Sequence, residues 1–284
     1  MLCDLHTHSI FSDGTDTPEA LIEKAEALGL GAVALTDHNS VAGLPRFLAA
    51  AEGRSVIAVP GIEFSTGYEN GELHILALFV RPEHYDAIRA LAAQPDRLKR
   101  ESNLALAEAL NRVGYKIDYA ALEASTPDGR VNRVQFANAL LAQGYVATKD
   151  EAFDTLLKPG GPFYQPPKRL DALETIRFIR SIGAVSVLAH PWLNRKTPEA
   201  LRSFLDEAVP AGLDGMEVRY AKFSREESNL ALEIARSYSL AFSGGSDYHG
   251  TNKKNIALGS GQGDLAVPMK YYEKLAELAQ KRAE

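Results

Sequence analysis

Short runs of apolar residues alternate along the chain with segments in which apolar residues recur every three or four positions. Seven of the runs are rich in Val, Ile and Leu and predict β-strands, at Leu2–His6, Ala32–Thr36, Val56–Phe64, Leu73–Val80, Ala184–Ala189, Gly215–Arg219 and Leu240–Gly244. The segments with the longer period predict amphipathic helices, and a helix follows most of the strands. Strands that alternate with helices are typical of parallel βα units, so the sequence predicts an α/β fold.

The stretch from 83 to 168 breaks this alternation. It predicts consecutive helices with no clear strand between them, at Asp96–Val113, Tyr119–Ala124, Asn132–Gln143 and Lys149–Leu157. A loop rich in Pro and Gly ends the stretch. We interpret residues 1–82 and 169–284 as a barrel, and residues 83–168 as a helical insert between its fourth and fifth strands that covers the substrate.

Composition and charge narrow the class of protein. The chain has 284 residues, a normal length for one α/β barrel with an insert. Its net charge is −6 and its basic residues are dispersed, whereas a protein that grips duplex nucleic acid usually carries a basic face. We find neither an apolar run long enough to span a membrane nor the features of a signal peptide. Cys3 is the only cysteine, which excludes an intrachain disulfide, so we expect a cytoplasmic protein.

Six of the seven histidines and three carboxylates lie in the predicted strands or shortly after them. The nine residues are His6, His8, Asp13, His38, Glu63, His74, His190, Asp247 and His249. Most of them fall at carboxyl ends of strands, where barrel active sites gather. Residues i and i+2 of an extended segment point the same way, so His6 and His8 can reach one ion. His84 falls outside this pattern.

These nine residues predict a metal centre. Imidazole and carboxylate ligands together suit Mn²⁺, Fe²⁺ or Zn²⁺, whereas calcium prefers oxygen alone. No cysteine joins the set, which argues against a closed structural zinc site. Nine ligands exceed what one ion needs, so we expect two or three divalent ions that share carboxylates.

The same residues carry a resemblance to a known family. The segments that match are His6-Thr7-His8-Ser9, Ser12-Asp13-Gly14, Thr36-Asp37-His38, Gly61-Ile62-Glu63, His74, Ala189-His190-Pro191 and Gly245-Ser246-Asp247-Tyr248-His249. They resemble the PHP (polymerase and histidinol phosphatase) superfamily over nearly the whole chain, with all nine ligand positions filled. The resemblance implies a distorted (β/α)7 barrel, which agrees with the seven strands counted above.

The resemblance also implies how the ligands are shared among the ions. His6, His8, Glu63 and Asp247 would hold the first ion, and Asp13, His38 and His249 the second. The third would be held by His74 and His190, with Glu63 bridging it to the first.

Within the superfamily, the helical insert is similar to that of small nucleotide-directed phosphoesterases. Those enzymes remove phosphate from nucleoside 3′,5′-bisphosphates or trim short RNA from its 5′ end. The resemblance implies that Arg133, in the segment Asn132–Ala137, contacts the substrate phosphate. The chain departs from that group after Pro191 and at Ala221–Ser224, which affects the substrate pocket and spares the ligands.

The expected reaction is attack on phosphorus by a hydroxide that bridges the metal ions. We expect His190, Asp247 and Arg133 to carry the chemistry, with either His190 or a metal-bound water protonating the leaving oxygen. The positive charge of the metal ions would exceed the negative charge of the three ligand carboxylates. The resulting positive cleft would attract a small phosphorylated substrate, a nucleotide or short single-stranded RNA. Further phosphate contacts are predicted for Arg133, Arg195, Lys222 and Lys253.

Three alternatives stay open from the sequence. A histidinol-phosphate phosphatase would share the metal site and differ in its substrate pocket. An amidohydrolase would use a similar barrel, often with a carboxylated lysine where Glu63 stands here, and a non-catalytic metal-binding module would keep the ligands without turnover. Asp37 also has two interpretations, because it could orient a ligand histidine or cap the next helix.

Overall fold

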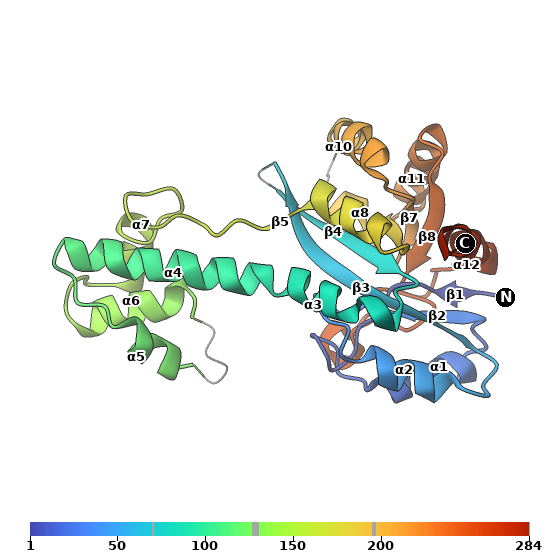
Figure 1. Ribbon diagram of the computed structural model, residues 1–284, viewed down its shortest axis with the longest axis horizontal. Helices are drawn as coiled ribbons and strands as arrows, with labels where there is room; N and C mark the ends of the chain where they lie inside the picture. The colour runs from blue at the N-terminus through green and yellow to red at the C-terminus, as the bar shows by residue number, and fades with distance from the viewer. Residues whose placement is uncertain (70, 127–130, 195–196, 284) are drawn as a thin grey trace. The chain divides into compact units, whose positions relative to one another are not determined.

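The computed structural model describes residues 1–69, 71–126, 131–194 and 197–283. The chain divides into two compact units (Figure 1). The first comprises Met1–Ala92 and Leu170–Glu284, and the second comprises Ala93–Arg169. The described helices include none that is long and apolar enough to cross a membrane.

The first unit is built on one curved sheet. Its strands are β1 (Cys3–Asp4), β2 (Ala32–Leu35), β3 (Ile57–Tyr68), β4 (Gly71–Leu78), β6 (Val185–Leu188), β7 (Gly215–Tyr220) and β8 (Ala241–Gly245), adjacent in that order, and the short β5 (Leu170–Asp171) pairs with β3. Neighbouring strands are parallel except at β4, which is antiparallel to both β3 and β6.

Backbone hydrogen bonds bring the two ends of this sheet together. The Leu5 amide donates to the carbonyl of Gly244 at 3.1 Å, and the Asp247 amide donates to the carbonyl of His6 at 2.9 Å. The seven-stranded sheet is therefore a nearly closed barrel. This confirms the predicted distorted (β/α)7 barrel.

Helices cover the outside of the barrel. In chain order they are α1 (Pro18–Ala27), α2 (Leu44–Ala51), η1 (Pro82–His84), α3 (Tyr85–Ala92), α8 (Ala172–Ser181), α9 (Pro191–Asn194), α10 (Pro198–Ala211), α11 (Arg225–Ser237), η2 (Gly250–Lys253) and α12 (Met269–Ala283). Thr17 caps α1 by accepting a hydrogen bond from the Ala20 amide, and Pro18 takes the first helical position.

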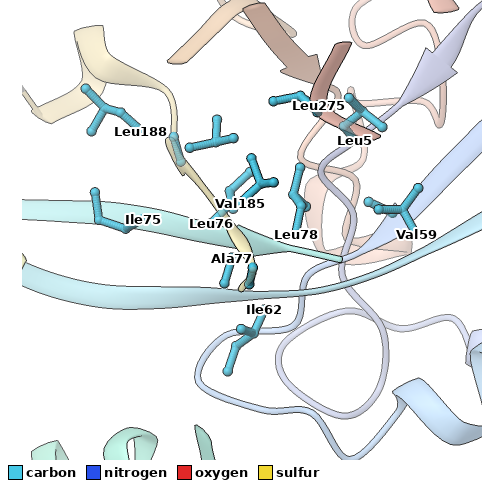
Figure 2. Packing of buried hydrophobic residues seen from close by; sticks show 14 of the residues in the cluster. Leu5, Val59, Ile62, Ile75, Leu76, Ala77, Leu78, Val185, Leu188 and Leu275 are labelled. Atoms are coloured by element: carbon cyan, nitrogen blue, oxygen red, sulfur yellow. The ribbon is translucent and has the colours of Figure 1, made fainter. Parts of the chain in front are cut away.

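The main hydrophobic core lies among the strands and the helices that cover them. Figure 2 shows Leu76 and Leu78 of β4 beside Val185 of β6, with Leu5 and Leu275 of α12 nearby. All five side chains are buried. This packing fixes the strand ends, and the polar residues that follow those ends inherit a defined position.

The second unit is helical and has a core of its own. Its helices are α4 (Gln94–Arg112), α5 (Tyr119–Ala124), α6 (Arg133–Ala142) and α7 (Lys149–Thr155). Asn132 caps α6 with a capping box. Its side chain accepts from backbone amides in the first turn of the helix, and the Gln135 side chain accepts from the Asn132 amide. Leu106, Leu110 and Phe136 belong to the buried cluster of this unit.

Candidate metal centre

The first two histidines follow the shortest strand of the barrel. β1 ends at Asp4, and His6 and His8 lie in the extended segment that continues it. Thr7 forms a parallel bridge with Tyr248 and donates its hydroxyl to the carbonyl of Ala34 at 2.5 Å. Thr7 thus points to one side and both histidines to the other. The Nε2 atoms of His6 and His8 lie 3.1 Å apart.

The β3–β4 hairpin positions the next two groups. Glu63 pairs with Leu76, and Ser65 pairs with His74, so Glu63 and His74 are diagonal neighbours on one face of the hairpin. His74 Nδ1 lies 2.8 Å from Glu63 Oε1. The antiparallel turn in an otherwise parallel barrel is what brings a residue from the fourth strand to this end.

Two of the nine residues have backbone conformations that L-amino acids rarely adopt. His190 has a φ of 27° and Asp247 a φ of 55°. Such conformations cost about 1–3 kcal/mol each and persist only where the surrounding structure holds them. His190 comes two residues after the end of β6 and Asp247 two residues after the end of β8. The side chain of His190 lies beside Glu63, and that of Asp247 lies beside His8.

Eight of the nine side chains, all but His190, form three overlapping groups of potential metal ligands. The groups are His6, His8, Glu63 and Asp247; His8, Asp13, His38 and His249; and His38, Glu63 and His74. The first matches the set that the resemblance implied, and the second adds His8. The third contains His38 where we expected His190. His190 lies close by, with its Nε2 atom 3.0 Å from Glu63 Oε1.

Hydrogen bonds on the far side of the imidazole rings fix which nitrogen faces the centre. His6 Nδ1 donates to Glu217 Oε1 at 3.1 Å, and His249 Nδ1 donates to the carbonyl of Asp247 at 2.8 Å. His190 Nδ1 donates to Asn194 Oδ1 at 3.1 Å. In each case the Nε2 lone pair is left facing the cluster. Metal-binding histidines are held by acceptors in this way.

Several buried polar atoms in the cluster have no hydrogen-bond partner. Glu63 Oε2 lies 3.1 Å from His6 Nε2, 3.2 Å from His8 Nε2 and 3.1 Å from His38 Nδ1, yet it forms no hydrogen bond in the described structure. A buried carboxylate oxygen without a partner is costly. Two ligand atoms that bind the same metal ion, each at about 2.0–2.2 Å, lie about 3 Å from one another, which is the spacing seen between Glu63 Oε2 and these nitrogens. The residues therefore fit divalent metal ions.

Charges at close range keep the carboxylates ionised. Burial by itself would raise the pKa of Glu63, but His6, His74 and His190 hold that pKa well below its usual value. Asp247 behaves in the same way, since burial opposes its charge while His6 and His8 keep its pKa low. Both carboxylates are therefore available as ligands across the physiological pH range.

The pKa values of two histidines in the cluster are shifted in opposite directions. Burial lowers the pKa of His38 to about 4, and the Glu63 carboxylate offsets that effect only in part. Burial also opposes charge on His74, but the carboxylates of Glu63 and Glu72 raise its pKa to about 9. A proton on His74 must leave before its nitrogen can bind a metal ion.

The sequence analysis missed two buried carboxylates that support the cluster. Glu217 accepts from His6 Nδ1 and, at 2.7 Å, from the backbone amide of His190. Asp4 accepts from the Ser246 amide and the Gly259 amide, both at 2.8 Å, and so holds the loop that carries Asp247. The available signal was an acidic residue between apolar neighbours in a predicted strand, Cys3 and Leu5 around Asp4 and Met216 and Val218 around Glu217, because acidic side chains are rarely buried without partners.

The structure gives Asp37 a role that neither sequence interpretation described. Its carboxylate accepts from the Ser9 amide, the Ser9 hydroxyl and the Ser12 hydroxyl, each at 2.7 Å. These bonds hold the loop that leads to Asp13. Asp37 therefore acts on that loop.

Comparison with known proteins gives this arrangement a family. The model of the PHP domain matches residues 4–154. The chain belongs to the PHP domain family.

Individual relatives cover most of the chain. The 5′-3′ exoribonuclease Rnm of Escherichia coli is 31% identical over 88% of this chain and 85% of its own length. The 3′,5′-nucleoside bisphosphate phosphatase of Chromobacterium violaceum is 29% identical over 87% of this chain and 86% of its own.

A solved structure supports the same placement. A candidate metal-dependent phosphoesterase from Bifidobacterium adolescentis is 29% identical, with a TM-score of 0.65 over 97% of this chain and 96% of that one. Together with the cluster, these likenesses identify the PHP chain as a metal-dependent hydrolase.

The residues predicted to contact phosphate are distributed over both units of this PHP protein. Lys253 donates to Asp247 Oδ2 at 2.6 Å, beside the cluster, and Lys222 is exposed in the turn after β7. Arg133, in the second unit, donates to the carbonyl of Leu157 and stacks on Tyr164 at 5.0 Å. Arg195 lies outside the described residues.

Proposed function

We propose that this PHP protein is a phosphoesterase that acts on small nucleotides. Its substrates would be nucleoside 3′,5′-bisphosphates or the 5′ end of short single-stranded RNA. The observation that carries the proposal is Glu63 Oε2, a buried oxygen that three histidines surround without a hydrogen bond. The names of the E. coli and C. violaceum relatives support the choice of substrate.

We assign two or three divalent ions, Mn²⁺, Fe²⁺ or Zn²⁺, to the nine residues. His6, His8, Glu63 and Asp247 would hold one ion, and Asp13, His38 and His249 a second, while His74 and His190 with Glu63 would complete a third. Bound there, the ions would lower the pKa of water toward neutrality and offset the charge of phosphate oxygens.

The protein's own groups would orient this centre. Tyr220 donates its hydroxyl to Asp247 Oδ2 at 2.8 Å, and Lys253 donates to the same oxygen, so Asp247 Oδ1 is left to face His8 at 3.2 Å. Glu217 holds His6 and the backbone of His190 at once. His190 would either bind the third ion through Nε2 or, where that nitrogen is protonated instead, donate a proton to the leaving oxygen. Lys253 and Arg133 would bind the substrate phosphate.

A substrate panel tests the proposal. Phosphate release would be measured with added Mn²⁺ from adenosine 3′,5′-bisphosphate, AMP, 5′-phosphorylated RNA and histidinol phosphate, and amide substrates would be assayed in parallel. We expect turnover of a nucleotide or RNA that Asp13→Ala and His190→Ala abolish. Arg133→Ala should weaken it without abolishing it if residues 83–168 cover the substrate.

The other outcomes are distinct. Turnover of histidinol phosphate alone would replace the nucleotide assignment with histidinol-phosphate phosphatase. Hydrolysis of amides without phosphate esters would select the amidohydrolase. Metal binding without any turnover would select the non-catalytic module.

A further inference from the structure

The first unit has a cavity of about 230 Å³ that none of the nine proposed ligands lines. Its lining includes Arg219, Tyr220, Arg225 and Ser228. Tyr220 belongs to both places, because its hydroxyl donates to Asp247 Oδ2. The cavity and the surroundings of the proposed metal ligands therefore have Tyr220 in common.

A β-bulge in β7 turns Arg219 toward this cavity. In a regular strand, residues 217 and 219 would point the same way. Here Glu217 pairs with Ser243 and Arg219 pairs with the next residue, Gly244, so the side chain of Arg219 takes the opposite face to Glu217. A Cβ atom at position 244 would lie 2.8 Å from that of Arg219, so glycine there leaves room for the arginine stem.

The polar groups of the cavity have unused hydrogen-bonding capacity. Within the described residues, neither Arg219 nor Arg225 forms an ion pair or a side-chain hydrogen bond. The Ser228 side chain is buried, with 5% of its surface exposed, and its hydroxyl has no partner there either. Among the described residues, the lining contains two arginines and one acidic residue, Asp264.

This combination fits a phosphate group. A guanidinium presents paired N–H donors that match two phosphate oxygens, and a hydroxyl adds a further donor. Phe223 and Leu265 supply the apolar part of the lining.

We propose that the cavity lined by Arg219, Arg225 and Ser228 binds a phosphate group that is not hydrolysed. The group would belong either to the substrate, as its second phosphate, or to free inorganic phosphate. The first source rests on the proposed function, and the second does not.

The test compares Arg219→Met/Arg225→Met with Arg236→Met, which removes an exposed arginine from the far end of α11. Metal-loaded enzyme would be assayed with adenosine 3′,5′-bisphosphate and with p-nitrophenyl phosphate, which has one phosphate. Loss of charge-assisted hydrogen bonds should lower kcat/KM for the bisphosphate by about tenfold or more in the double variant. The value for p-nitrophenyl phosphate should not change, and the control should match the wild type for both.

Equilibrium dialysis with labelled inorganic phosphate gives the second arm. If free phosphate is the ligand, the wild type should bind one more phosphate per chain than the double variant, whatever esters it hydrolyses. Equal losses for both substrates, or no change in either assay, would overturn the proposal. If the wild type hydrolyses no phosphate ester, the proposed function fails and the dialysis alone decides.

Discussion

Glu217→Gln is the sharpest single test of the metal centre. Each oxygen of the Glu217 carboxylate is buried and accepts one hydrogen bond, from His6 Nδ1 at 3.1 Å and from the His190 amide at 2.7 Å. Glutamine keeps the size of the side chain but only one acceptor, so its amino group must face one of these two donors. One charge-assisted hydrogen bond is lost, and a buried donor is left unpaired.

The expected cost is about 2 kcal/mol, within the range for hydrogen bonds to charged groups. If the metal-bound state alone is destabilised by about 2 kcal/mol, the dissociation constant for the metal rises by about 30-fold. Loss of a carboxylate behind a ligand histidine has effects of this size. Part of the cost should also appear as a lower Tm of the protein without metal, since the His190 amide is held in that state too.

The assay is competition for Mn²⁺ or Zn²⁺ against a fluorescent chelator, with thermal unfolding measured in parallel. Glu226→Gln is the matched control, because Glu226 is an exposed acidic residue in the first turn of α11. Wild-type metal affinity together with a wild-type Tm in Glu217→Gln would refute the reasoning. A lower Tm with unchanged metal affinity would restrict Glu217 to a structural role.

Three further predictions concern the same centre. The protein stripped of metal by a chelator should lose stability as the pH rises from about 6.5 to about 9. The pKa of His74 is raised from 6.5 to about 9 in the folded protein, so its protonation stabilises the fold fully below pH 6.5 and no longer does so above about pH 9. In a plot of Tm against pH, the His74→Asn variant should lack this decline. Tyr220→Phe removes one of two donors to Asp247 Oδ2 and should lower kcat about tenfold with little change in KM, and an unchanged kcat would contradict its positioning role. Asp37→Asn should weaken one metal site more than the others, since it loosens the loop before Asp13, and equal weakening of all sites in metal titrations would count against this.

Much of the barrel could be predicted from the sequence because apolar runs and strand-end residues are local signals. The ends of α5 were predicted at Tyr119 and Ala124, as observed. The antiparallel pairing of β3 with β4 was not foreseen. Strand direction depends on partners far along the chain, which apolar periodicity does not encode.

The ligand residues were predictable as a set, whereas their supports were not. His6 and His8 stand in a recognisable pattern, and their spacing has a geometric meaning. Glu217 lies 211 residues from His6 along the chain, and only the fold brings the two together. A bulge such as the one that turns Arg219 outward is likewise invisible in the alternation of polar and apolar residues.

The seam that closes the barrel has a consequence for how the protein can change. Its backbone hydrogen bonds join Leu5 to Gly244 and Asp247 to His6. These bonds therefore lie at, or next to, residues that we assign as metal ligands. A chelator should thus act on this protein as a mild denaturant, with amide exchange rising first along this seam. A substitution that changes the packing of β1 against β8 should also move the side chains of His6, His8 and Asp247. At this edge of the barrel, a change in stability is therefore expected to change the metal centre as well.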